Sequence, residues 1–155
     1  MHIRKRYLYW VATIAIAAMV SGCISFHRGY VFVSVAGSMD DAYIKTNQLI
    51  KNTEFKPLGI GDESNFENVY YGYRIVEKHE RGQLNRNFSI SVWKDTEEQQ
   101  IVLIFGEANV RGFSKDGKSM VENFRCRLIS EFGENNVSFG EDKETLHALW
   151  KRLHR

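Results

Sequence analysis

Proline, cysteine and surplus charge of either sign are scarce in this sequence. Its 155 residues include Pro 1, Cys 2, and Lys+Arg 21 against Asp+Glu 19. One proline and Gly 12 exclude collagen-like and proline-rich chains, and two cysteines exclude a disulfide-dense scaffold. A hydrophobic content of 43% is too high for a disordered chain. The composition therefore indicates a single globular domain.

The few basic charges in excess lie at the N-terminus. Arg4, Lys5 and Arg6 precede an uncharged run from Leu8 to Val20, and residues 1–22 contain no acid. A basic segment followed by an apolar run is the layout of a secretory signal. The run is shorter than the roughly 20 residues of a membrane-spanning helix. An uncleaved anchor that extends to Phe26 is the alternative interpretation.

A short motif ends this segment. The residues Val20-Ser21-Gly22-Cys23 resemble the lipobox of bacterial lipoproteins, in which small residues precede a cysteine. The resemblance covers only the segment up to Ile24, and leucine is commoner than valine at position 20. It implies that the sulfur of Cys23 receives a diacylglyceryl group and that a dedicated peptidase cleaves before it. Cleavage by the ordinary signal peptidase, without lipid, is the alternative.

The resemblance also implies a domain organisation and a location. Residues 1–22 are the expected lipoprotein signal peptide, 23–29 a lipidated tether and 30–155 a single domain. Ile24 occupies the position where aspartate favours the inner membrane in enteric bacteria, so the outer membrane is expected. Basic residues before the apolar run stay cytoplasmic, so the domain is expected to face the periplasm.

Removal of the signal changes the charge of the protein. Residues 1–22 hold three of the 21 basic residues and none of the acids, which leaves 18 bases against 19 acids and a formal net charge of −1. A nearly neutral domain has no electrostatic attraction to nucleic acid, so no such partner is expected.

Strand and helix patterns alternate in residues 30–155. Segments rich in β-branched and aromatic residues predict strands at 30–36, 55–58, 68–76, 88–93, 101–105 and 137–139. Amphipathic segments predict helices at 39–52 and 115–132, and a last helix that opens at 141–144 and closes at 155. The order predicts an α+β two-layer sandwich with a mostly antiparallel sheet and helices on one face. A ferredoxin-like variant is the favoured topology.

Local signals support the helix ends and the core. Ser38 and Ser114 precede two of the helices as N-caps, and Gly133 follows the second as its stop. The segment 101–105 is uniformly apolar, which indicates the central strand. The lone Cys126 is expected to be buried in the second helix as a small hydrophobe, with a reactive thiol as the alternative.

No convincing catalytic, cofactor or metal site is present, and none is predicted. His79-Glu80 begins a zinc signature, but Gln83 stands where the second histidine would be. Glu144 and His147 share one face of the last predicted helix, with His154 two turns further on, but zinc would need a third ligand from elsewhere, so a solvated helix face is the preferred interpretation. Three short motifs are interpreted as a turn or as helix capping rather than as ligand sites: Gly59-Ile60-Gly61, Asp40-Asp41 and Asp62-Glu63.

Two features suit an interaction surface. Tyr71 and Tyr73 share one face of a strand and Tyr70 lies on the other, although packing under the helices explains these aromatics as well. The basic end at 150–155 could contact anionic headgroups, although the helix dipole also accounts for it.

The expected function is a non-enzymatic, lipid-anchored envelope protein that binds another envelope protein. The alternative is a small periplasmic hydrolase or ligand-binding domain with a cleft between sheet and helices.

Overall fold

A six-stranded antiparallel sheet runs through the residues that this computed structural model describes, which are 26–62, 67–79, 82–108 and 113–154. The strands lie in the order β2-β3-β4-β5-β1-β6. Their bounds are Phe26–Ser34 (β1), Gly59–Ile60 (β2), Asn68–His79 (β3), Gly82–Asp95 (β4), Gln100–Ala108 (β5) and Val137–Gly140 (β6). The three helices are Met39–Lys51 (α2), Lys115–Phe132 (α3) and Lys143–Leu153 (α4), and a 3₁₀ turn (η1) spans Glu134–Asn136. The predicted α+β class with an antiparallel sheet is confirmed.

Strands β3, β4 and β5 form an antiparallel meander, and β1 pairs with β5, the last strand of this meander. In β1, Val31 pairs with Leu103 of β5 and with Phe139 of β6, both antiparallel. The ferredoxin-like topology follows the order β-α-β-β-α-β. This chain adds β2, a third meander strand and α4 to that order.

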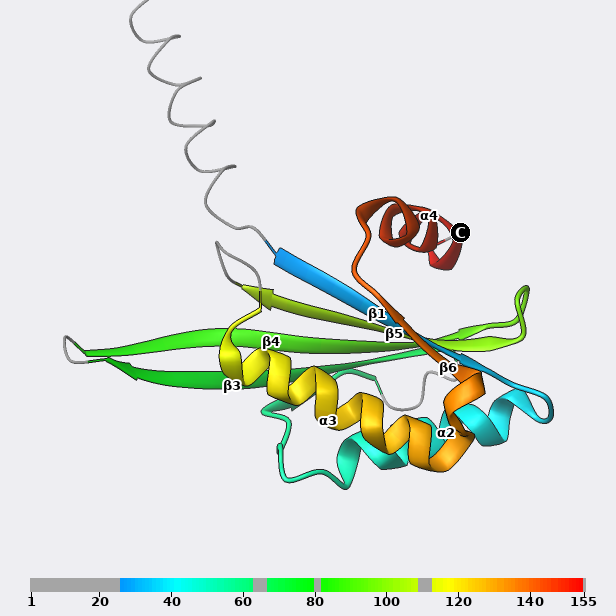
Figure 1. Cartoon of the computed structure of the whole chain (residues 1–155), viewed down its shortest axis with the longest axis horizontal. Helices are drawn as coiled ribbons and strands as arrows, with labels where there is room; N and C mark the ends of the chain where they lie inside the picture. Colours follow the sequence, from blue (N-terminus) through cyan, green and yellow to red (C-terminus); the bar gives the residue numbers. More distant parts are fainter. Residues whose placement is uncertain (1–25, 63–66, 80–81, 109–112, 155) are drawn as a thin grey trace, which may run out of the picture.

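Helices α2 and α3 cover one face of the sheet (Figure 1). Alternate residues of each strand point toward them, as the period of two in a strand requires. The central residues of this layer are almost inaccessible to solvent and come from β4, β5 and α3: Phe88, Ile90, Leu103, Phe105, Phe124 and Leu128. This layer is the main hydrophobic core.

Helix α4 lies on the opposite face, which differs from the expectation that all helices share one side (Figure 1). The intervening residues of β1 and β5 are apolar too, and they form a second cluster with Leu149 of α4: Tyr30, Val102 and Ile104. Because β5 is apolar on both sides, each face needs a cover. The interior position predicted for this strand is confirmed.

The helix ends follow the predicted capping residues. The hydroxyls of Ser38 and Ser114 accept hydrogen bonds from the amides of Asp41 and Gly117, at 3.2 and 3.0 Å. Gly133 ends α3 with a φ of 88°, a conformation that favours glycine. Asp142 caps α4 in the same way, through the amide of Thr145 at 2.8 Å.

Two predicted strand positions are corrected. The edge strand expected at 55–58 is absent there, and β2 forms instead at Gly59–Ile60, where a loop was expected. Leu58 only donates its amide to the carbonyl of Gly72, at 2.8 Å. Strand β1 begins at Phe26 rather than Tyr30.

Cys23 and the rest of residues 1–25 lie outside the described residues, so the signal peptide and the lipidation site remain predictions. Of the helices described, none has the length and apolar character needed to cross a membrane.

Candidate functional site

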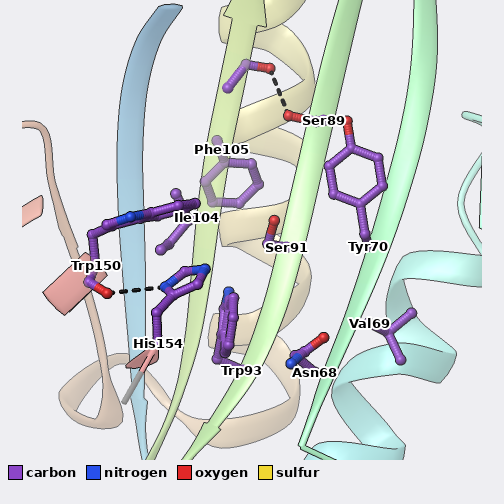
Figure 2. Close-up of a pocket in the computed structure, with 11 residues that line it drawn as sticks. Asn68, Val69, Tyr70, Ser89, Ser91, Trp93, Ile104, Phe105, Trp150 and His154 are labelled. Carbon is purple, nitrogen blue, oxygen red and sulfur yellow. Dashed lines mark hydrogen bonds between the residues drawn. The ribbon is translucent and has the colours of Figure 1, made fainter. Parts of the chain in front are cut away.

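A groove lies on the face of the sheet that carries helix α4, and Figure 2 shows the side chains that line it. The groove has a volume of about 430 Å³, and its floor is formed by β3, β4 and β5. Its lining residues are Asn68, Val69, Tyr70, Ser89, Ser91, Trp93, Ile104, Phe105, Gly106, Trp150 and His154. We call this feature the α4 groove.

Strand alternation places the floor residues. Phe88, Ile90 and Val92 point into the main core, so Ser89, Ser91 and Trp93 between them point toward α4. The prediction that Tyr70 opposes Tyr71 and Tyr73 is confirmed, because the latter two are buried and Tyr70 is 52% exposed. The expected packing under helices therefore holds for Tyr71 and Tyr73 only.

Three aromatic rings form one end of the groove. The ring of His154 lies 3.8 Å from that of Trp150 and 4.7 Å from that of Trp93, measured between centroids. Nδ1 of His154 also makes a 2.9 Å hydrogen-bond contact with the carbonyl of Trp150. Trp150 lies on α4, and 46% of it is exposed.

The indole nitrogen of Trp93 is an unusual feature of this end. It is buried, and it has no hydrogen-bond partner among the described residues. A buried donor without a partner costs about 1–3 kcal/mol, so such groups are uncommon in folded proteins. A bound molecule that accepts a hydrogen bond from the indole nitrogen of Trp93 would therefore remove this energetic cost.

The groove carries almost no charge. None of the described residues that line it is Asp, Glu, Lys or Arg, and His154 supplies its one imidazole. The hydroxyl of Ser89 donates to the carbonyl of Gly106 at 3.4 Å. Among the described lining residues, no carboxylate and no second histidine lies beside His154.

The residues considered for metal binding do not come together. Glu144 and His147 are exposed on α4, and His154 lies in the aromatic stack. His79 ends β3, while Glu80 and the side chain of His79 lie outside the described part. The described residues contain no group of three or more His, Cys, Asp or Glu side chains placed to hold a metal ion.

The acidic and glycine motifs have structural roles where they are described. Asp40 forms an ion pair with Lys94 of β4. Gly59 and Ile60 form β2, and Gly61 donates its amide to the carbonyl of Tyr70 at 2.7 Å. Glu63 lies outside the described residues.

The expected burial of Cys126 is wrong, because its side chain is exposed. The buried face of α3 contains Met120, Val121, Phe124 and Leu128, and position 126 lies roughly opposite on a helix of 3.6 residues per turn. The thiol instead contacts Glu122, with 3.6 Å between Sγ and Oε1.

Part of the basic end of α4 is engaged within the protein. Arg152 forms an ion pair with the buried carboxylate of Asp95 and a second one with Glu98 at 3.6 Å. A headgroup could reach Lys151, which is exposed, but Arg152 already has two acidic partners.

Sequence reasoning missed a buried carboxylate on the other face of the sheet. Glu107 is 0% exposed, accepts a hydrogen bond from the amide of Ser114 at 2.8 Å, and lies 3.8 Å from the guanidinium of Arg86. Negative charge at the N-terminus of α3 is stabilised by the helix dipole. The signal was available in the sequence, because Glu107 interrupts an apolar strand, but it indicates a structural role.

Comparison with known proteins identifies no family. No family model and no curated protein matches the chain. Solved structures with a limited similarity include the Ran-binding protein Mog1p of Saccharomyces cerevisiae and a point mutant of Mog1. The identities are 13% and 12%, over 75% and 74% of this chain and 68% of each of those chains, with TM-scores of 0.31. Similarity at this level carries no conclusion about function.

Proposed function

We propose that this protein is a lipid-anchored component of a bacterial cell envelope whose domain binds another envelope protein through the α4 groove. The observation that carries the binding function is the uncharged groove with Tyr70 and Trp150 half-exposed beside it. Interface cores are depleted of charged residues and enriched in Tyr and Trp. Such residues also supply a large share of binding energy.

Anchoring at Cys23 rests on the lipobox-like residues 20–23. A single acyl chain binds a membrane only marginally, so two or three chains on one cysteine are needed for stable attachment. Strand β1 begins at Phe26, so the chain between the lipid and the sheet would be short. The domain would then lie close to the membrane surface, with the outer membrane as the proposed location.

Substitution of Cys23 tests the anchor. We expect Cys23→Ala to leave a precursor that is longer, takes up no labelled palmitate and is not cleaved before position 23. The matched control is Cys126→Ala, which removes the other thiol and should be processed normally. Normal cleavage and labelling of Cys23→Ala would refute lipidation at this residue. Density-gradient separation of the labelled protein distinguishes the two membranes.

Site-specific cross-linking tests the binding function. A photoreactive residue at Tyr70 or Trp150 in the full-length protein should form adducts with one recurring envelope protein in the native host. The same residue at Ile44, which is 47% exposed on α2 on the other side of the sheet, is the matched control. Adducts that form equally at Ile44, or at none of the positions, would contradict a role for the groove.

Binding of a small molecule is the second candidate function. Ligand sites in proteins commonly have volumes of about 300–1,000 Å³, and the α4 groove falls within this range. A groove that forms no protein adduct, but whose tryptophan fluorescence changes with an envelope extract depleted of protein, would favour this alternative.

A further inference from the structure

The chemistry of the α4 groove restricts what kind of partner segment it can hold. Charged residues make up 26% of the chain, yet none is among the described residues that line this groove. A charged group placed there would lose hydration without gaining an opposite charge. The occupant is therefore uncharged where it meets the floor.

We propose that the groove holds an uncharged, extended segment of the partner protein. One aliphatic or aromatic side chain of the segment sits between Tyr70 and Trp150, and one main-chain carbonyl accepts a hydrogen bond from the indole nitrogen of Trp93. This inference rests on the proposed binding function and names the part of the partner that is recognised. Figure 2 shows Tyr70 and Trp150 on opposite sides of the groove, with Ser91 between them on the floor.

The dimensions of the floor set the length of the segment. The groove crosses β3, β4 and β5, and adjacent strands are about 4.8 Å apart, so the floor spans about 10 Å. An extended chain advances about 3.3 Å per residue. About three residues of the partner therefore contact the floor, one of them through the seated side chain.

The hydroxyl of Ser89 already donates to the carbonyl of Gly106, and the lining offers aromatic and aliphatic surface beside the indole nitrogen of Trp93. A peptide offers both an apolar side chain for this surface and a carbonyl for Trp93.

Trp93 supplies the hydrogen-bond donor that the segment requires. Its indole nitrogen is buried without a partner among the described residues, and the His154 ring stacks against it at 4.7 Å. His154 is exposed at the end of α4, and the proposal requires its ring to move from its contacts with the two indoles when the acceptor binds. Binding therefore satisfies a donor that has no partner among the described residues of the free protein.

The composition of the cross-linked segment tests the inference. Adducts formed from Tyr70 and Trp150 in the full-length protein are digested, and mass spectrometry maps the partner residues at each position. We expect both positions to map to one stretch with three consecutive uncharged residues, at least one of them aliphatic or aromatic. A charged stretch, or an adduct that contains glycan rather than peptide, would overturn the inference while leaving groove binding intact.

A synthetic peptide of the mapped stretch tests the role of each groove residue. It is titrated against the full-length protein in detergent. We expect about tenfold weaker binding to Trp93→Phe, which keeps an aromatic ring but removes the donor. Ser91→Asp should weaken binding by about 30-fold or more, because it places a carboxylate on the floor. The matched control Ser130→Asp adds the same charge on the exposed side of α3 and should bind as the wild type does.

The unfolding midpoint of each variant shows whether it folds. Should Ser91→Asp prove unfolded, Trp93→Phe and the mapped segment still decide the outcome. Wild-type affinity in a folded Trp93→Phe protein would refute the hydrogen bond, and wild-type affinity in a folded Ser91→Asp protein would refute recognition of an uncharged segment. If no adduct forms from either groove position, the proposed function itself fails.

Discussion

Arg152 of α4 forms an ion pair with Asp95, the last residue of β4, and so fastens the C-terminal helix to the sheet. The side chain of Asp95 is only 2% exposed, and Gln100 also donates to it at 2.9 Å. Removal of one partner from a buried ion pair leaves an uncompensated charge, which is more costly than the loss of an exposed pair. This contact holds α4, and with it Trp150 and His154, beside the groove.

Loss of this contact should destabilise the domain measurably. We expect Arg152→Ala to lower the free energy of unfolding by about 1–3 kcal/mol, somewhat less than for a fully buried pair because the guanidinium is 27% exposed. Urea unfolding followed by circular dichroism measures the change. The matched control is Arg125→Ala, whose pair with Glu122 on α3 is exposed and should contribute less than about 0.5 kcal/mol. Equal effects of the two substitutions would contradict the anchoring role of Arg152.

The N-cap of α4 should make stability depend on acidic pH. Hydrogen bonds from Thr145 and from the hydroxyl of Tyr30 lower the pKa of Asp142 from 3.8 to about 2. A pKa that is lower in the folded state gives stability that is complete above the unfolded value and is lost as the pH falls through the folded value. The contribution of Asp142 is therefore expected above about pH 4 and should disappear between about pH 4 and pH 2.

Substitution of Asp142 isolates this contribution. Asn also caps helices but does not titrate, so Asp142→Asn should lose less stability than the wild type between pH 4 and pH 2. Chemical unfolding at a series of pH values gives both curves. Parallel curves for Asp142→Asn and the wild type would show that the cap does not titrate as described.

Gly117 and Glu107 fit together too closely for a larger residue. A Cβ atom added at position 117 would lie 2.2 Å from Oε2 of Glu107, the same oxygen that accepts from the amide of Ser114. Alanine normally stabilises a helix interior by up to about 1 kcal/mol relative to glycine. Here the clash would displace a buried carboxylate, at a cost of about 1–3 kcal/mol for overpacking alone.

We therefore expect Gly117→Ala to destabilise the protein by about 1–2 kcal/mol despite its better helix propensity. Thermal and urea unfolding measure the effect. Gly37→Ala is the control, because a Cβ at that position meets nothing within 4 Å and should be neutral or slightly stabilising. A stabilised Gly117→Ala protein would show that Glu107 has room to move.

The alternation of side chains along a strand made the floor of the groove predictable from the sequence. The alternation of apolar residues with Ser89, Ser91 and Trp93 places these three on one face of β4, and the same rule separates Tyr70 from Tyr71. Alternation specifies a face, but it does not specify what covers that face. The sequence therefore identified floor residues without identifying a groove.

The side of the groove that α4 forms depends on which face of the sheet this helix packs against. Its apolar stripe, including Leu149, predicts a buried helix face equally well on either side of the sheet. Only the tertiary contacts of Leu149 with Tyr30 and Val102 bring His154 next to Trp93. These partners are distant in sequence, and no local propensity encodes their pairing.

The exposed thiol of Cys126 gives a direct test of the orientation of α3. In the full-length Cys23→Ser protein, Cys126 is the only thiol, and we expect a maleimide reagent to label it fully under native conditions. Because an exposed side chain needs no opening of the structure, the labelling rate should not change in low urea. The matched control adds Val121→Cys to a chain in which Cys23 and Cys126 are both replaced by Ser, which moves the only thiol to a position that is only 5% exposed. That thiol should be protected until the domain opens, and rapid labelling there together with protection of Cys126 would place the opposite face of α3 against the sheet.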